Sequence, residues 1–211
     1  MPRTSKVRGI FYQKYLNMSR RKILFEKGKY YHVYNRGCNR LDIFREEENY
    51  RFLTEKIASS ANDCHISVIA YCLMPNHYHL LVRQDSDVPV SRFIQTIFNS
   101  YTKAFNKRYE RTGTLFEERF EAKEVDTDEY LIHLSRYIHL NPVKAKLVPA
   151  CEDWEFSNYR EWIGLRQSLL FDTDLTSTLS KNFTSYKSFV GEYNVARSND
   201  LLLQKYLFDE D

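Results

Sequence analysis

A histidine pair in an apolar segment is the part of the sequence best suited to chemistry. The stretch Leu73–Val82 reads LMPNHYHLLV, in which Tyr78 separates His77 from His79. Side chains two positions apart project from the same face of a β-strand, so both imidazoles would lie together. Neutral imidazoles at this spacing can bind Mn²⁺, Mg²⁺ or Zn²⁺ together with an oxygen ligand. Two core histidines with protein partners would give the same pattern.

A second group of candidates lies in the later segment RYIHLNPVKAKLV. His133, Tyr137 and Asn141 are spaced at i, i+4 and i+8, which share one face of a helix. If this face crosses the histidine strand, the Asn141 oxygen becomes a third metal ligand and Tyr137 lies near a metal-bound phosphate. A phenol, with a pKa of about 10, is a weak nucleophile at neutral pH. A metal ion helps by stabilising charge on the attacking and leaving oxygens.

Tyr137 and Asn141 also each have a purely structural interpretation. Tyr137 has the spacing of a packed aromatic residue in an amphipathic helix. Asn141 stands before a proline, where residues that end helices are common. The spacing therefore fits both a metal and phosphate site and ordinary helix packing.

Strands and helices that position these residues follow from hydrophobic periodicity. We expect strands over 29–36, 65–73, 77–83 and 115–125, with Pro75–Asn76 closing a hairpin between the second and the third. We expect helices over 46–61 and from Pro89 onwards, the latter capped by Asp87, and a third that starts at Asp126 or Thr127 and ends at Pro142. This order, β-α-β-β-α-β-α, predicts an α+β protein with helices packed on an antiparallel sheet, as in ferredoxin-like or RRM-like domains.

Composition indicates an ordinary globular protein. Hydrophobic residues make up 43% of the 211 residues and glycine and proline are few, so one domain with terminal additions can bury a core. No apolar run approaches the about 18 residues of a membrane span, and the N-terminus lacks the apolar core of a signal peptide. The four cysteines have no zinc-site spacing. We therefore expect a cytoplasmic protein with reduced thiols and no membrane contact.

Charge is unevenly distributed along the chain, whose formal net charge is +3. Residues 1–29 contain nine Lys or Arg and one Glu, whereas the remainder is mildly acidic. Such a basic arm can bind phosphates through counterion release, and Arg20, Arg21 and Lys22 are candidate DNA contacts within it. A solvated basic terminus without a ligand would have the same composition.

Four motifs in a fixed order resemble a known family. MPNHYHLLV is followed by GTLFEERF, RYIHLNPVKAKLV and WEFSNY, and the similarity runs from Gly28 to about Gly164. The series resembles the single-tyrosine HUH transposases of the insertion-sequence-200-like superfamily, and above all the REP-associated tyrosine transposases. The resemblance implies a basic N-terminal arm over 1–27, a transposase domain over 28–148, and a mostly helical extension packed on it over 149–211.

The resemblance also implies roles for individual residues. His77 and His79 match the paired metal histidines, Tyr137 matches the nucleophilic tyrosine, and Asn141 matches the third ligand on the helix, where some members have glutamine. His133 and His139 match no functional position and are expected to be structural.

A further element of the resemblance is the NRG sequence after the first strand. Its Arg36, together with Arg40, is a candidate DNA contact, although solvated turn residues would have the same sequence.

The implied reaction is cleavage and rejoining of single-stranded DNA beside a hairpin or palindrome. With Mg²⁺ or Mn²⁺ as cofactor, Tyr137 would attack phosphorus, giving a 5′-phosphotyrosine and a free 3′-hydroxyl that later restores the strand. The covalent intermediate stores the bond energy, so no ATP is needed, and the sequence has no Walker-type glycine loop. Because the resemblance is to the REP-associated branch, we expect this protein to be a monomer rather than a homodimer.

Two other functions fit part of the pattern. A replication-initiator or relaxase-like nickase would use the same site, but the short chain has no helicase or origin-binding region. A catalytically silent DNA- or RNA-binding regulator could share the fold, but the histidine pair and the tyrosine are intact. Metal-dependent cleavage of a labelled hairpin would distinguish the silent protein from the enzymes.

Overall fold

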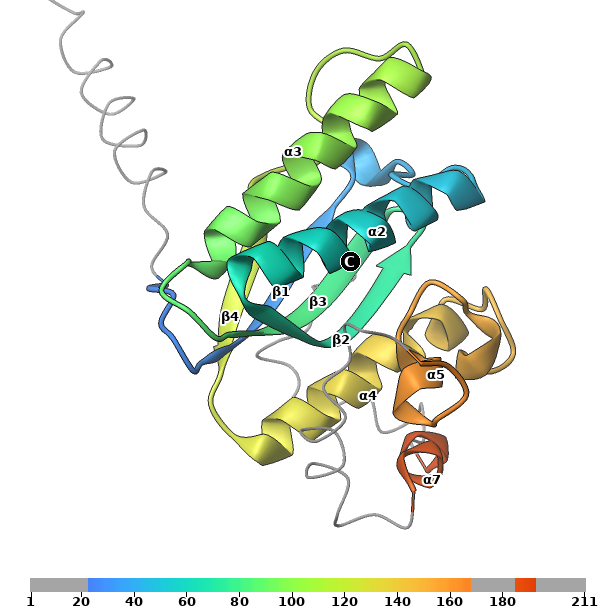
Figure 1. Ribbon diagram of the computed structural model, residues 1–211. Helices are drawn as coiled ribbons and strands as arrows, with labels where there is room; N and C mark the ends of the chain where they lie inside the picture. The colour runs from blue at the N-terminus through green and yellow to red at the C-terminus, as the bar shows by residue number, and fades with distance from the viewer. Residues whose placement is uncertain (1–22, 168–184, 193–211) are drawn as a thin grey trace, which may run out of the picture.

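The computed structural model describes residues 23–167 and 185–192 and has a four-stranded antiparallel sheet at its centre (Figure 1). The strand order is β2-β3-β1-β4, so β3, which carries the histidine pair, is an interior strand. A two-residue turn joins β2 to β3 and pairs Met74 with His77. The order confirms the predicted α+β, ferredoxin-like topology. The strands are β1 (Tyr30–Arg36), β2 (Ile66–Met74), β3 (His77–Gln84) and β4 (Glu121–Val125).

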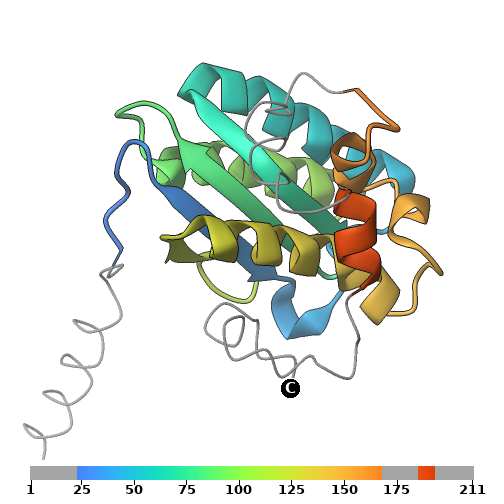
Figure 2. The ribbon, with the colours of Figure 1, turned by 90° about the horizontal axis from the view of Figure 1, so that it is seen from below.

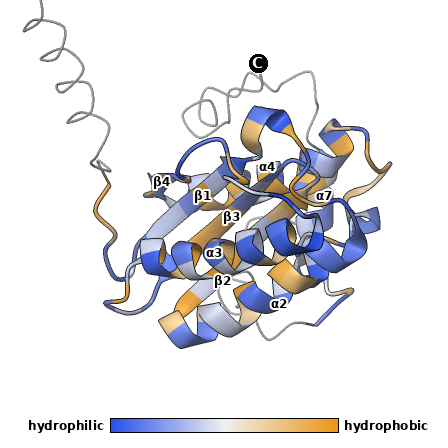
Figure 3. Ribbon diagram, turned by 90° about the horizontal axis from the view of Figure 1, so that it is seen from above, coloured by the Kyte–Doolittle hydropathy of each residue, from blue (hydrophilic) through white to orange (hydrophobic). Residues whose placement is uncertain are grey.

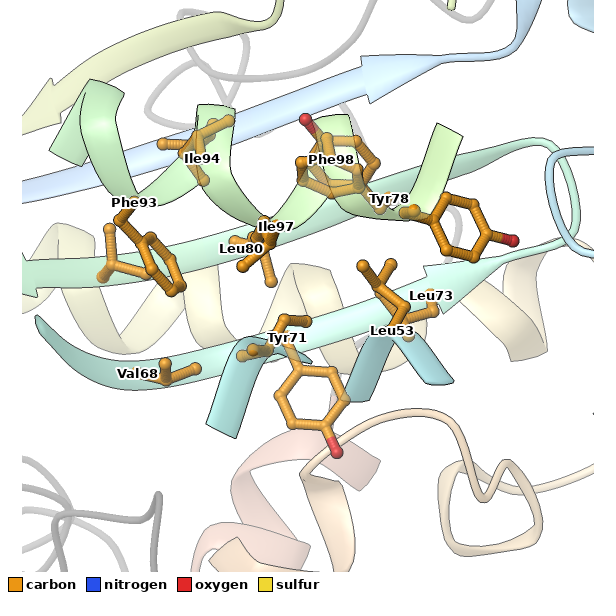
Figure 4. Packing of buried hydrophobic residues seen from close by; sticks show 14 of the residues in the cluster. Leu53, Val68, Tyr71, Leu73, Tyr78, Leu80, Phe93, Ile94, Ile97 and Phe98 are labelled. Carbon is orange, nitrogen blue, oxygen red and sulfur yellow. The ribbon is translucent and has the colours of Figure 1, made fainter. Parts of the chain in front are cut away.

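Helices α2 (Glu47–Cys64) and α3 (Val90–Arg108) cover one face of the sheet (Figure 1). Hydrophilic and hydrophobic stretches alternate along both helices (Figure 3), as expected for helices with one buried face. Figure 4 shows how side chains of α3, such as Phe93, Ile97 and Phe98, pack against those of the strands beneath them. This layer is the larger hydrophobic core and contains no residue of the candidate site.

Helix α4 (Asp128–Lys144) lies on the opposite face of the sheet (Figure 2). It starts where expected, because the Thr127 hydroxyl accepts a hydrogen bond from the Tyr130 N–H and acidic residues occupy the first turn. Its apolar side packs on Ile69 and Leu81 of the sheet. Three short helices follow α4 among the described residues, and α7 lies beside it in Figure 2. They are η2 (Cys151–Asp153), α5 (Tyr159–Trp162) and α7 (Tyr186–Gly191).

The segment 154–162 covers the outer edge of β2. The Asn158 side chain acts as a strand partner, because its Oδ1 accepts from the Tyr71 N–H at 2.7 Å and its Nδ2 donates to the Ile69 carbonyl at 2.9 Å. The Trp162 indole also donates to the Ile69 carbonyl, at 3.0 Å. From Ile69 to Leu73, these contacts occupy backbone groups with which a strand of another chain would otherwise pair. This is the structural role of the WEFSNY motif.

The predicted starts of β4 and α3 were wrong. The strand predicted over 115–125 begins only at Glu121, since the preceding segment is irregular and joins the sheet by a single bridge between Gly37 and Phe116. Helix α3 is capped by Pro89 rather than Asp87, and the first helical N–H is bound by the Gln84 side chain at 3.1 Å. Within residues 23–167 and 185–192, no helix is long and apolar enough to cross a membrane.

Candidate active site

The histidine pair lies on the α4 side of β3, at the end next to the β2–β3 turn. The centroids of the His77 and His79 rings are 5.2 Å apart and the rings are almost perpendicular. His79 is 1% exposed, whereas His77 is half-buried. The predicted placement of both imidazoles on one face of a strand is therefore observed.

The orientation of the His77 ring is set by Asn76. Asn76 Nδ2 donates to the Arg40 carbonyl at 3.3 Å, which turns Asn76 Oδ1 toward His77 Nδ1, 2.7 Å away. An amide oxygen only accepts, so neutral His77 carries its proton on Nδ1. Burial lowers the pKa of His77 to about 4, although a side-chain hydrogen bond with Asn141 acts in the opposite direction. The ring is thus neutral at pH 7, the state required of a metal ligand.

His79 has a different partner, His32 on β1. His32 Nε2 lies 3.0 Å from His79 Nδ1, and the two rings are stacked with centroids 5.2 Å apart. Burial, and then the neighbouring His32 and His77 rings, hold the pKa of His79 well below its usual range. His79 is therefore also neutral at pH 7.

Helix α4 extends past Pro142 to Lys144, which corrects the predicted end of the helix. Proline has no N–H to give to the Ile138 carbonyl. The Asn141 side chain compensates, because its Nδ2 donates to the Tyr137 carbonyl at 2.9 Å and to the Ile138 carbonyl at 3.4 Å. With Nδ2 held by the helix backbone, Oδ1 is the end of the amide that is left to serve as a ligand.

Tyr137 packs against the histidine pair from α4. Its ring centroid lies 5.7 Å from that of His79 in an edge-on contact, and the residue is 2% exposed. Lys144 Nζ lies 4.7 Å from the centroid of the Tyr137 ring, a cation–π distance. The structure therefore brings Tyr137, Asn141 and both histidines together, as the sequence predicts.

A cavity of about 240 Å³ opens beside His77 and Asn141. No carboxylate occurs among the described residues that line it. His79 and Tyr137 do not line the cavity but contact residues that do. Its lining consists of three cations and five other residues: Arg36, Arg40, Lys144, Met74, Asn76, His77, Asn141 and Ala145. Such a lining suits an anionic ligand, and phosphate in particular.

Arg36 and Arg40 reach the cavity because of a tight turn between them. Gly37 is required in this turn, since a Cβ there would lie 2.1 Å from the Leu41 carbonyl oxygen. The Gly37 N–H donates to the Asn76 carbonyl at 2.8 Å, which ties the turn to the β2–β3 hairpin. The Arg36 guanidinium also pairs with Glu117 at 3.0 Å.

Other candidate residues lie elsewhere. Arg20, Arg21 and Lys22 are outside the described residues. His133 and His139, expected to be structural, contact the segments that follow α4: His133 packs edge-on against Phe189, and His139 binds Tyr186 and Asn158.

Three residues at the site were missed by the sequence analysis. Asn76 precedes the histidine pair directly and so had a signal in the motif itself, whereas Lys144 lies beyond Pro142, where the helix was predicted to end. His32 had none, because its place beside His79 depends on the pairing of β1 with β3.

His77 and His79 supply only two ligands, so a divalent metal ion would also need the Asn141 side-chain amide. Residues 23–167 and 185–192 contain no group of three or more His, Cys, Asp or Glu that could hold one. Two neutral imidazoles and the Asn141 oxygen lie together, however, and imidazole with amide oxygen is suitable ligation for first-row divalent ions. The residues present are thus compatible with the cofactor that the sequence predicts.

Comparison with known proteins identifies the family of the chain. The family model described as "Transposase IS200 like" matches residues 26–141, more than half of the chain. A search of curated proteins found no match. A solved REP-associated tyrosine transposase bound to a REP hairpin is 22% identical with a TM-score of 0.59, over 75% of this chain and 96% of that one.

A candidate transposase from Deinococcus radiodurans R1 is 15% identical with a TM-score of 0.40, over 57% of this chain and 94% of that one. This weaker likeness adds nothing to the family assignment, which rests on the family model. The chain belongs to the family of IS200-like transposases.

Proposed function

We propose that this chain is a metal-dependent endonuclease and strand transferase that cuts single-stranded DNA next to a hairpin or palindrome. The observation that carries the proposal is the convergence of His77, His79, Tyr137 and Asn141 beside a cavity lined by three cations. Membership of a transposase family supports the reaction class. The REP hairpin in the similar structure supports a hairpin substrate.

In this proposal His77, His79 and Asn141 Oδ1 hold Mg²⁺ or Mn²⁺. When bound, the ion supplies positive charge to the non-bridging oxygens of the scissile phosphate and to the attacking and leaving oxygens. Asn76 keeps His77 in the tautomer that leaves Nε2 unprotonated, and the helix carbonyls bind Asn141 Nδ2, which leaves Oδ1 as the ligand atom.

Tyr137 is the nucleophile. A bond forms between its Oη and phosphorus while the bond from phosphorus to the 3′ oxygen breaks. The phenol proton is lost, the 3′ oxygen takes one up, and the products are a 5′-phosphotyrosine and a 3′-hydroxyl. Because Tyr137 is 2% exposed, DNA binding must make the phenol accessible, as when substrate binding completes a catalytic site.

The remaining features of the proposal concern binding and organisation. Arg36, Arg40 and Lys144 would contact the DNA backbone, and the basic arm over 1–27 would add further contacts. The transposase domain would span 28–148 and the extension 149–211. A monomer is supported by the outer edge of β2, where backbone groups from Ile69 to Leu73 already bind segments of the same chain. The proposed place of action is the cytoplasm.

The test is a denaturing gel of the protein incubated with 5′- or 3′-labelled hairpin DNA from the flanks of its own gene, with Mn²⁺ or with EDTA. We expect a metal-dependent covalent adduct that retains the downstream strand and disappears in Tyr137→Phe, with DNA binding unchanged. Tyr159→Phe is the matched control, since Tyr159 is equally buried but lies beside His139.

Three outcomes would contradict the proposal. An adduct that persists in Tyr137→Phe would exclude this nucleophile. Tight hairpin binding without an adduct in any metal would favour the catalytically silent regulator. An adduct that forms equally well in EDTA would exclude the metal-dependent mechanism.

A further inference from the structure

His32 is a buried polar residue beside the candidate site that the proposed function does not use. It lies on β1 and is completely buried. Its strand neighbour Tyr34 is the Cα partner of His79, so His32 stands two residues along on the same face of the sheet. Its Nε2 reaches His79 Nδ1 at 3.0 Å.

A hydrogen bond between two imidazoles needs one protonated and one unprotonated nitrogen. Two arrangements satisfy the observed distance. Either His79 Nδ1–H donates to His32 Nε2, or His32 Nε2–H donates to His79 Nδ1. The first leaves His79 Nε2 unprotonated, whereas the second places a proton on it.

His77 shows which arrangement the site is built for. Asn76 offers an oxygen to His77 Nδ1, which places the proton there and keeps Nε2 as an acceptor. His79 is engaged at the same ring atom, Nδ1, and is the second histidine of the pair. A ligating histidine typically donates its other N–H to a partner that fixes its tautomer and orientation.

We infer that His32 is a positioning residue that accepts a hydrogen bond from His79 Nδ1–H and thereby keeps His79 Nε2 available to the metal ion. The inference rests on the proposed function, because it assigns His79 as a ligand. The same hydrogen bond links β1 to β3 directly beside the site, and so fixes the His79 ring relative to the neighbouring strand. His32 itself contacts neither metal nor DNA in this assignment.

The tautomer can be measured in the unaltered protein. In a long-range ¹H–¹⁵N NMR spectrum at pH 7.5, protonated and unprotonated imidazole nitrogens have separate ¹⁵N shifts. We expect both His79 and His32 to be protonated on Nδ1 and unprotonated on Nε2, since Nε2 is the atom with which His32 accepts the hydrogen bond. A proton on His79 Nε2 in the metal-free protein would overturn the inference whatever the protein does to DNA.

The second test measures Mn²⁺ binding to the full chain by calorimetry or electron paramagnetic resonance. His32→Leu removes the acceptor, and the expected loss of affinity is about 10- to 100-fold, as for other outer-sphere partners of ligating histidines. His32→Gln places an amide oxygen near the position of Nε2 and should restore most of the affinity. The control is His139→Leu, which alters an equally buried histidine outside the site and should leave Mn²⁺ affinity per folded molecule unchanged.

The outcomes separate the inference from the proposed function. Unaltered Mn²⁺ affinity in a folded His32→Leu variant would overturn the inference alone. If His32→Leu does not fold, the His32→Gln affinity and the wild-type tautomer decide the question, and loss of binding in His32→Gln despite a native fold would count against an acceptor role. Failure of the wild type to bind Mn²⁺ would overturn the proposed function, and the role of His32 with it.

Discussion

Two buried histidine sites adjoin the same helix and differ in what encloses them. His139, on α4, is completely buried, and both of its ring nitrogens bind protein groups: Tyr186 Oη at 2.8 Å and Asn158 Oδ1 at 2.9 Å. The rings of Tyr159 and Trp162 also pack edge-on against it. These partners all follow α4 in the chain, so His139 fastens the later segments to the helix.

The other site is the histidine pair of β3. His77 and His79 are each held through Nδ1, by Asn76 and His32 respectively. His77 borders a cavity with three cations in its lining, whereas His139 is enclosed by aromatic rings. The first environment suits a metal and an anion, and the second suits only packing.

His77 and His139 show that a shifted pKa does not by itself identify a functional histidine. Burial lowers the pKa of both His77 and His139 to about 4. Structural networks perturb titration as readily as active sites do. What distinguishes the two residues is the cavity, its positive charge and the nearby Tyr137.

We expect the greatest change when one histidine of each kind is replaced in turn. His79→Ala should abolish Mn²⁺ binding and the covalent DNA adduct while leaving the fold intact. His139→Leu should retain the adduct per folded molecule but lower the free energy of unfolding by about 1–3 kcal/mol, because the Tyr186 hydroxyl loses its partner. Adduct gels and urea unfolding of both variants measure the two effects.

Two results would contradict this distinction between His79 and His139. Adduct formation by folded His79→Ala would remove this residue from the metal site. Loss of the adduct in folded His139→Leu would give His139 a role beyond packing.

The sequence was sufficient to predict most of the fold and the neighbours at the site. Alternating and helical periodicities are local, and they predicted the element order that the sheet confirms. The spacings of His77 and His79, and of Tyr137 and Asn141, are also local. The structure brings these four residues together, although their chemical roles remain predictions.

The parts that could not be predicted depend on long-range or compensating contacts. His32 lies beside His79 only because of the register between β1 and β3, which no local pattern determines. Lys144 was missed because a proline normally ends a helix, and here the Asn141 side chain supplies the missing donor.

The second prediction separates the observed helix contacts of Asn141 from its proposed role as a metal ligand. Asn141→Ala should lose Mn²⁺ affinity and also destabilise α4, by about 1 kcal/mol for the lost hydrogen bonds. The double variant with Pro142→Ala restores a backbone N–H for the Ile138 carbonyl, so it should recover stability but not metal affinity. Thermal unfolding and calorimetry with Mn²⁺ check this. Recovery of both properties would show that Asn141 serves the helix alone.

The third prediction concerns pH and tests the structural histidine. The pKa of His139 is about 4 in the folded protein, compared with 6.5 for an ordinary histidine. Both states are neutral above pH 6.5, but between pH 6.5 and 4 the unfolded chain binds a proton that the folded protein does not, so stability falls as pH falls. The loss is about 1.4 kcal/mol for each pKa unit.

The measurement is the free energy of unfolding from pH 7.5 to 4 for the wild type and His139→Leu. The variant lacks the group and should lose less stability over this window. His77, whose pKa is also about 4, contributes equally to both proteins and cancels in the difference. Parallel pH profiles would contradict the assignment of His139 as a neutral, structural residue.

The smallest expected effect is on the salt dependence of DNA binding, and it tests whether the cavity cations contact phosphates. Each phosphate contact to single-stranded DNA contributes about 0.7 to the slope of log K against log salt. Arg40→Gln and Lys144→Met should each reduce the slope by about this amount. Arg36→Gln should reduce it less, because Glu117 already pairs with Arg36 at 3.0 Å. Lys56→Met, on α2 across the sheet, should leave the slope unchanged, and an equal change in all four variants would mean that the protein's overall charge, not this cavity, attracts the DNA.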